Sequence, residues 1–220
     1  MGLFIIRCIL VLIIGYLLGS INTSIIVGKC YGIDIRKHGS GNAGMTNTLR
    51  TLGKVAAVLV VLGDILKGVL SYIIGNIILN SAAMDGVFGS QLSTVVGIGG
   101  MAGGIAAIIG HNWPLYFGFK GGKGILTSFA VVMMMDWQLG LILFGIFLVV
   151  VIITRYVSLS SITVCVVFPI AAYIKGNGLV FSVFAAILSL LAICRHSANI
   201  KRLINGTESK IGAKKKDIER

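Results

Sequence analysis

Long apolar runs separated by short polar segments dominate this chain. A membrane helix needs about 20 apolar residues to cross a hydrocarbon core roughly 30 Å thick. We predict a transmembrane helix for each apolar run, about seven in all. Their approximate ranges are 3–27, 55–79, 88–109, 124–135, 138–154, 157–174 and 178–194. An arrangement with five spans stays open as the alternative, because 124–135 is short and 88–109 is dense in glycine.

The composition agrees with a membrane protein. Only 12% of the 220 residues are charged and 56% are hydrophobic, and the mean hydropathy is +0.99. Soluble domains contain about 25% charged residues, so this chain carries about half the usual charge. We therefore expect an all-α integral membrane protein in which residues 1–220 form a single polytopic domain.

The distribution of positive charge predicts the orientation. With the N-terminus outside, nearly all lysines and arginines fall in the cytoplasmic segments or the C-terminal tail, the exceptions being Arg7, Lys67 and Lys175. Those segments are about 28–54, 110–124, 155–161 and 195–208, followed by the tail 209–220. Cytoplasmic segments of membrane proteins are enriched in lysine and arginine. We therefore place the N-terminus outside and the C-terminus in the cytoplasm, and we expect the basic tail to contact anionic headgroups.

The four cysteines give no sign of a metal site. Cys8, Cys30, Cys165 and Cys194 lie in or beside apolar runs, and none forms a CxxC pair. We interpret them as small apolar residues and expect no bound metal.

The first cytoplasmic segment contains a cluster of glycine, amide and hydroxyl residues, GSGNAGMTNTLR, at 39–50. Glycine lets backbone N–H groups turn toward a ligand, and the fork of Arg50 can hold two phosphate oxygens. An ordinary polar loop at the membrane interface is the alternative. The candidate ligands here are Gly39, Ser40, Gly41, Asn42, Asn47 and Arg50.

The second cytoplasmic segment begins near His111 and ends in FKGGKG, directly before an apolar helix. Glycines ahead of a helix N-terminus suit an anion, and Lys123 adds a full charge. The segment is not a Walker A loop, because Gly124 stands where Ser or Thr is required. The alternative is a flexible interfacial turn with snorkelling lysines. The candidates here are His111, Gly121, Gly122, Lys123 and Gly124.

Three further groups of polar residues are candidates. His196 and Asn199 are three residues apart, so on a helix both point into one site. Glu208 follows in a basic stretch, where pairing with a neighbouring cation is the alternative role. Asp64 and Lys67 have helical spacing within a membrane span, where charge is costly, so a function is expected. A salt bridge that pins two helices is the alternative for that pair.

Taken together, these motifs closely resemble the bacterial acyl-phosphate:glycerol-3-phosphate acyltransferase family. The resemblance covers almost the whole chain and keeps the motifs in order. Met45 and Ile125-Leu126 depart from the usual family residues without removing a polar group. The matching stretches are 19–22, GSGNAGMTNTLR at 39–50, 64–68, GHNWPLYFGFKGGKG at 110–124, RYVSLSSI at 155–162 and RHSANIKRLINGTE at 195–208.

The resemblance implies transfer of an acyl chain from acyl phosphate to the 1-hydroxyl of glycerol 3-phosphate, the first step of phospholipid synthesis. It implies a multi-pass enzyme of the bacterial cell membrane whose active site faces the cytoplasm. No cofactor, metal, nucleic acid or obligate protein partner is implied. Arg50 and Lys123 would hold phosphate, and His196 and Asn199 would orient glycerol phosphate. The residues that would line the site are Ser40, Arg50, Lys123, Ser161, His196 and Asn199.

The residues also suggest how the proton moves. None of His38, His111 and His196 is followed by Asp five residues later, so the His-x4-Asp arrangement of other glycerolipid acyltransferases is absent. Our hypothesis is direct transfer in which the phosphate of the donor accepts the hydroxyl proton. A transporter of a phosphorylated metabolite is the main alternative function, and a structural protein that binds anionic lipid is another.

Overall fold

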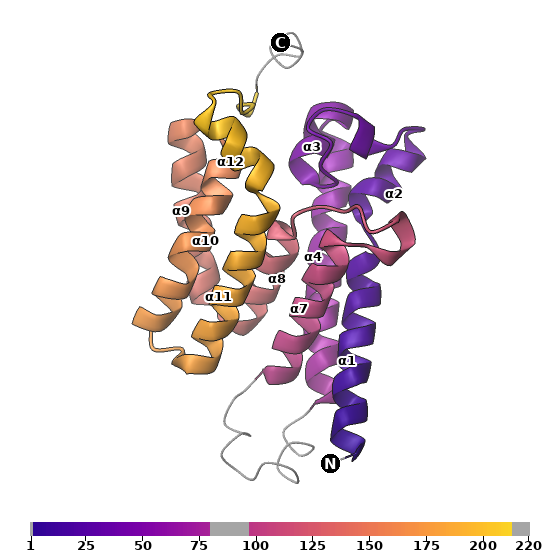
Figure 1. The fold of residues 1–220 in the computed structure, drawn as a ribbon, viewed down its shortest axis with the longest axis vertical. Helices are drawn as coiled ribbons and strands as arrows, with labels where there is room; N and C mark the ends of the chain where they lie inside the picture. The colour runs from indigo at the N-terminus through magenta and orange to yellow at the C-terminus, as the bar shows by residue number, and fades with distance from the viewer. Residues whose placement is uncertain (1, 80–96, 213–220) are drawn as a thin grey trace. The chain divides into compact units, whose positions relative to one another are not determined.

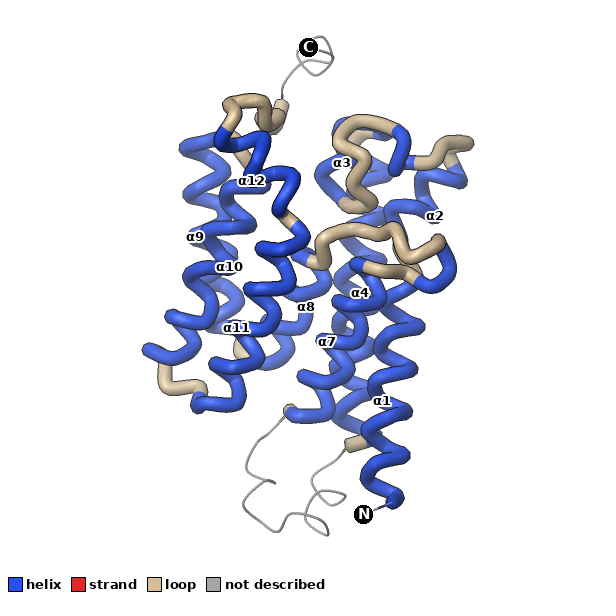
Figure 2. Tube along the Cα trace, in the orientation of Figure 1, coloured by secondary structure: helices blue, strands red, loops and turns tan. Residues whose placement is uncertain are grey.

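The computed structural model describes residues 2–79 and 97–212, and every regular element in those ranges is a helix. The chain divides into two compact units, Met1–Met135 and Asp136–Arg220. The described part of each unit is a set of helices, as Figures 1 and 2 show.

The first unit is built around the long helix α4 and the glycine-rich helix α7. In Figure 1, α1, α4 and α7 run side by side, and α8 packs on α4 and α7. The loops between α2 and α3 and between α7 and α8 lie at one end of these helices (Figure 2). The elements are α1 (Gly2–Ser20), α2 (Thr23–Cys30), η1 (Ile35–Lys37), α3 (Met45–Leu52), α4 (Lys54–Ile78), α7 (Ile98–Asn112), η2 (Leu115–Phe117) and α8 (Ile125–Met135).

Glycine allows α7 to lie very close to its neighbours. A Cβ atom at Gly110 would stand 2.2 Å from the carbonyl oxygen of Tyr16 on α1. A Cβ at Gly103 would stand 2.3 Å from the carbonyl oxygen of Ser71 on α4. Small residues at helix crossings permit this approach in membrane proteins. The predicted span 88–109 is rich in glycine, and in its described part these glycines allow α7 to pack closely against α1 and α4.

The first predicted span, 3–27, is interrupted and is not one helix. Helix α1 ends at Ser20, and the side chain of Asn22 caps α2 by accepting a hydrogen bond from the N–H of Ile25 at 3.2 Å. An N-cap asparagine adopts extended backbone angles, which break the preceding helix. The break lets the hydroxyl of Ser20 accept from the N–H of Leu115 at 3.2 Å, so the end of α1 contacts the loop that follows α7.

The second unit contains three long helices and one short one. They are α9 (Trp137–Thr154), α10 (Val157–Ile174), α11 (Gly178–Arg195) and α12 (Ser197–Ile204). Asp136 caps α9 by accepting from the N–H of Leu139 at 3.0 Å and also pairs with Lys175 beyond α10. Helix α12 lies at the end of the unit where α9 ends and α10 begins (Figure 1).

Among the described residues, five helical segments are long and apolar enough to cross a membrane. They are Gly2–Cys30, Lys54–Ile78, Trp137–Thr154, Val157–Ile174 and Gly178–Arg195. Helix α8 has 11 residues and α7 has 15, so both are shorter than a full span. Residues 88–96 of the third predicted span lie outside the described ranges. The number seven therefore stays a prediction.

Candidate functional site

The first glycine-rich segment is only partly a loop. Residues 39–44 form a turn in which Gly39 and Gly41 have positive φ, and α3 begins at Met45 and includes Arg50. The stretch 39–50 is therefore part turn and part helix. Met45, which departs from the usual family residue, packs with Leu52 against a buried apolar cluster of Val27, Ala56 and Val60. That packing fixes the start of α3.

Asn47 holds this turn in shape. Its side-chain oxygen accepts from the N–H of Ser40 at 2.9 Å, and its nitrogen donates to the carbonyls of Ile35 at 3.1 Å and His38 at 3.0 Å. Asn47 is 1% exposed. These contacts give it a structural role in the turn. The side chain of Ser40, in contrast, is exposed, and Arg50 is half-buried.

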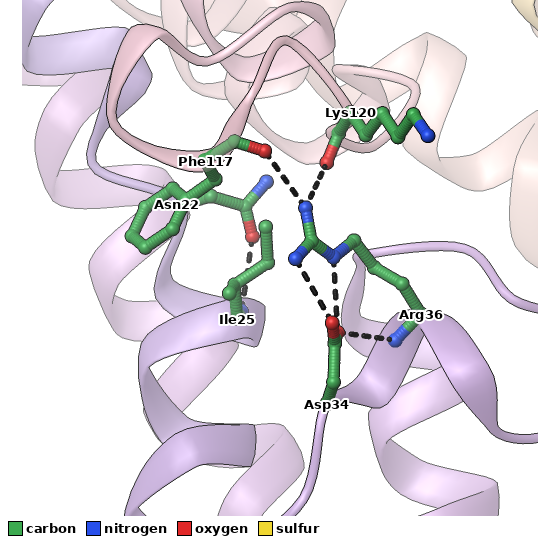
Figure 3. Close-up of polar contacts among 6 residues, drawn as sticks. All are labelled: Asn22, Ile25, Asp34, Arg36, Phe117 and Lys120. Carbon is green, nitrogen blue, oxygen red and sulfur yellow. Dashed lines mark hydrogen bonds and ion pairs between the residues drawn. The ribbon is translucent and has the colours of Figure 1, made fainter.

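Arg36 joins the first polar segment to the second. Its guanidinium donates to both carboxylate oxygens of Asp34 at 2.9 Å, and it donates to the carbonyls of Phe117 at 2.8 Å and Lys120 at 3.3 Å (Figure 3). The hydrogen bonds from Arg36 lower the pKa of Asp34 to about 2. Only the planar fork of arginine can make this double contact. In the sequence, Arg36 was treated only as one of the cations of the first cytoplasmic segment. The Asp-x-Arg spacing was the one sign that Asp34 and Arg36 form an ion pair.

The two consecutive glycines of the second segment do not form the anion cradle that we predicted. The N–H of Gly121 donates to the carbonyl of Asn112 at 3.2 Å, and that of Gly122 donates to the carbonyl of His111 at 3.1 Å. These two hydrogen bonds attach the segment to the C-terminal end of α7. A helix leaves its first N–H groups without partners of its own, so the donors that suit an anion belong to the first turn of α8, beside the half-buried Lys123.

Gly122 lies at the contact between the two polar segments. A Cβ atom there would stand 2.1 Å from Nε2 of His111 and 2.4 Å from the carbonyl oxygen of Ala43. Only glycine permits so close an approach. The turn before α3 and the segment that carries Lys123 are thus packed directly against each other. Gly124 adopts a left-handed conformation, with φ of +75°, immediately before α8.

Asp64, Lys67 and His111 form one buried group. The ammonium of Lys67 is 2.8 Å from Oδ1 of Asp64, within the same helix, and 2.7 Å from Nδ1 of His111 on α7. The three residues are between 1% and 4% exposed. The predicted ion pair exists, and it also joins α4 to α7.

In the second unit, His196 and Asn199 are both buried, at 2% and 5% exposure, whereas Ser197 and Ala198 between them are exposed. The Nδ1 atom of His196 lies 2.7 Å from the carbonyl oxygen of Ala192. A carbonyl can only accept, so Nδ1 carries a proton, and the neutral ring has its acceptor at Nε2.

Glu208 forms hydrogen bonds with three other side chains. Its carboxylate accepts from Ser158 and Asn199 at 2.7 Å and from Arg202 at 2.6 Å. Burial alone would raise the pKa of Glu208, but these hydrogen bonds outweigh it and hold the pKa below its ordinary value. Ser161, another predicted ligand, is buried and donates to the carbonyl of Val157 at 3.0 Å.

The structure brings some of the predicted residues together within each unit. In the first unit, Asn47 binds the main chain of Ser40, and Gly122 contacts His111, whose ring contacts Lys67. In the second unit, Asn199 donates to Glu208. Among the residues that the structure describes, no three His, Cys, Asp or Glu side chains gather as a metal site would require.

Comparison with known proteins gives the same family throughout. The family model described as glycerol-3-phosphate acyltransferase matches residues 9–206. The chain is 45% identical over 207 residues to the glycerol-3-phosphate acyltransferase of Thermoanaerobacter sp. (strain X514), covering 94% of this chain and 96% of that one. It is 42% identical over 210 residues to that of Clostridioides difficile (strain 630), covering 94% and 97%.

Two crystal structures of PlsY (YgiH), an integral membrane glycerol 3-phosphate acyltransferase, resemble this fold. The glycerol 3-phosphate form has a TM-score of 0.79 at 35% identity, covering 93% of this chain and 96% of that chain. The lysophosphatidic acid form has a TM-score of 0.77 at 34% identity, covering 93% and 95%. The protein is thus an all-helical integral membrane protein, and the chain belongs to the glycerol-3-phosphate acyltransferase family.

Proposed function

We propose that this protein transfers an acyl chain from acyl phosphate to the 1-hydroxyl of glycerol 3-phosphate, giving lysophosphatidic acid and phosphate. The relatives carry the name glycerol-3-phosphate acyltransferase, and one similar structure was solved in a glycerol 3-phosphate form. One observation in this chain carries the proposal furthest. Arg36 and Gly122 hold two polar segments together at the point where one of them leads through Lys123 into α8.

In this proposal, Lys123 and Arg50 bind phosphate oxygens. Lys123 is half-buried directly before the first turn of α8, where the helix dipole also favours negative charge. Charge that develops on the acyl carbonyl oxygen in the transition state would be stabilised by the same ammonium. Fixed donors of this kind are worth about 100-fold to 1,000-fold in rate.

His196 and Asn199 are proposed to orient glycerol 3-phosphate. The neutral His196 ring presents an acceptor at Nε2, which suits a substrate hydroxyl. The hydroxyl oxygen attacks the acyl carbonyl carbon, and the bond from that carbon to the phosphate oxygen breaks. The departing phosphate takes the hydroxyl proton, so all charges and atoms balance without a separate base. Positioning supplies most of the acceleration.

The membrane topology is part of the same proposal. We infer seven spans in one polytopic domain of the bacterial cell membrane, with the N-terminus outside and the active-site segments in the cytoplasm. The charge asymmetry supports this orientation. Within the first unit, segments 28–54 and 110–124 lie at one end, and within the second unit, 155–156 and 195–212 lie at one end (Figure 1).

A transporter of a phosphorylated metabolite is the second candidate, because the buried Asp64–Lys67 pair in α4 also suits that function. Sealed membrane vesicles that carry the protein distinguish the two. Labelled glycerol 3-phosphate and acyl phosphate are added outside inside-out vesicles and, separately, outside right-side-out vesicles. We expect labelled lysophosphatidic acid from the inside-out preparation, at least about 10 times more than from the other.

Two variants complete this experiment. Lys123→Ala should lower product formation about 100-fold. Lys120→Ala is the matched control, because the exposed side chain of Lys120 is removed while its carbonyl still accepts from Arg36. Unchanged label accumulating inside the vesicles would reject the enzyme in favour of a transporter. Near-normal turnover by an inserted Lys123→Ala variant would reject the site, and product from right-side-out vesicles alone would reverse the orientation.

A further inference from the structure

The buried group of Asp64, Lys67 and His111 is not required as a substrate ligand by the proposed chemistry, yet it puts two formal charges inside a helix bundle. Burying charge in this way is costly unless each group is fully hydrogen-bonded. Lys67 has three polar neighbours. Its ammonium forms an ion pair with Oδ1 of Asp64 at 2.8 Å and lies within hydrogen-bond distance of Nδ1 of His111 at 2.7 Å and of the carbonyl oxygen of Ile21 at 3.3 Å.

This arrangement fixes the tautomer of His111. An ammonium group can only donate, so Nδ1 of His111 must accept from Lys67. The proton of the neutral ring then lies on Nε2. A doubly protonated ring would instead put two cations 2.7 Å apart with no hydrogen bond between them. Asp64, whose Oδ1 lies 3.5 Å from the same Nδ1, forms the ion pair that holds the Lys67 ammonium beside the ring.

The Nε2 atom of His111 faces the segment that carries Lys123. A Cβ atom at Gly122 would stand 2.1 Å from Nε2, so the backbone of Gly122 lies directly against that edge of the ring. The main chain of His111 holds the same residue, since its carbonyl accepts from the N–H of Gly122 at 3.1 Å. The side chain and the main chain of His111 thus both contact the residue next to Lys123.

We propose that Asp64 and Lys67 are positioning residues that act through His111: they fix its ring so that Nε2–H is directed at residues 121–124 and holds Lys123 where it meets the phosphate. This inference rests on the proposed function, and it gives Asp64 and Lys67 a role other than direct substrate contact. In this inference, the buried ion pair contributes to the reaction by positioning Lys123 through His111.

Two substitutions of His111 separate its two ring nitrogens. Glutamine carries its terminal amide at about the place of Nε2, whereas asparagine carries it at about the place of Nδ1. If the ring acts on the segment through Nε2–H, His111→Gln keeps more activity than His111→Asn. We expect kcat to fall less than about 10-fold for Gln and about 100-fold for Asn, the loss that a misplacement of about 1 Å causes. The KM for glycerol 3-phosphate should stay within about twofold in both.

A neutral pair tests whether Asp64 and Lys67 act through His111. The double variant Asp64→Leu with Lys67→Met removes both charges together, so no buried charge is left alone. In the His111 background it should lower kcat about 10-fold, because the tautomer is no longer fixed. In the His111→Gln background it should cause no further loss beyond about twofold, because the amide has no tautomer to fix.

All variants are purified as full-length chains and checked by gel filtration and by the thermal midpoint of unfolding. Equal losses in the Gln and Asn variants, or better activity of Asn, would overturn the inference. So would equal losses from the neutral pair in both His111 backgrounds, or a rise in KM for glycerol 3-phosphate without a change in kcat. Absence of product from the unmodified protein would instead reject the proposed function itself.

Discussion

At the scale of single residues, His196 is the one on which the proposed proton path depends. Its ring is buried, and Nδ1 donates to the carbonyl of Ala192, which leaves Nε2 as the acceptor for a substrate hydroxyl. The contact with the carbonyl of Ala192 orients the ring, and a substrate hydroxyl would then meet Nε2.

We predict that His196→Gln keeps kcat within about threefold at saturating substrate while the KM for glycerol 3-phosphate rises about 10-fold. Glutamine can still bind a hydroxyl but cannot accept its proton, and a weakened hydrogen bond of about 1.4 kcal/mol accounts for the loss of affinity. Steady-state rates at several glycerol 3-phosphate concentrations measure both constants. His38→Gln is the control, because the side chain of His38 is exposed.

A fall in kcat of about 100-fold or more for His196→Gln would identify His196 as the general base instead. The loss of an acidic limb from the pH dependence of kcat would give the same answer.

Residue types could be predicted from the sequence, but the direction of their side chains could not. Ser40 and Asn47 look alike in a polar, glycine-rich stretch, yet Ser40 is exposed while Asn47 uses its whole amide within the turn. Ser161 likewise bonds to its own helix. Such choices depend on which carbonyls the folded backbone brings near, and these come from residues up to 12 positions away in the turn of Asn47.

At the scale of elements, the apolar runs predicted the three long helices of the second unit within one or two residues, because uninterrupted apolar sequence of about 18 residues has few alternatives in a membrane. The first unit was harder. The break at Asn22 and the helix α3 both depend on capping and tertiary contacts in polar sequence. Arg36 was missed as a structural residue, since its acceptors at 117 and 120 are far away in the chain.

Glu208 contributes to the attachment of the segment after α12 to the second unit, so that attachment should depend on pH. The pKa of Glu208 is lower in the folded protein than its ordinary value of 4.5. A lowered pKa stabilises the fold above the ordinary value, and that contribution is lost as the pH falls through the folded value. Acidification below about pH 4.5 should therefore weaken the contacts to Ser158, Asn199 and Arg202.

We predict that Glu208→Gln lowers stability at pH 7 by about 1–2 kcal/mol, since charged hydrogen bonds to a partly buried carboxylate are lost. The thermal midpoint of unfolding in detergent, measured from pH 7 to pH 3.5, provides the test. The difference between the two proteins should shrink as the pH falls below about 4.5. Lys201→Gln, an exposed change on α12, should show no such trend. A difference that stays constant or grows on acidification would contradict the assignment.

At the scale of the whole molecule, composition and apolar runs predicted an all-α membrane protein, and the resemblance of the ordered motifs indicated its family. Cationic segments gather at one end within each unit, which agrees with the charge asymmetry of the chain. Phosphate on both proposed substrates explains why cationic residues recur in separate segments. A long acyl chain on the donor explains why the enzyme is a membrane protein.

The choice of acyl donor tests the central claim most directly. Purified, reconstituted protein is supplied with glycerol 3-phosphate and, in separate reactions, with acyl phosphate or with acyl-CoA of the same chain length. We predict lysophosphatidic acid and an equal amount of released phosphate from acyl phosphate, at a rate at least about 100 times that with acyl-CoA. Equal or faster product formation from acyl-CoA, or no product from acyl phosphate, would contradict the account.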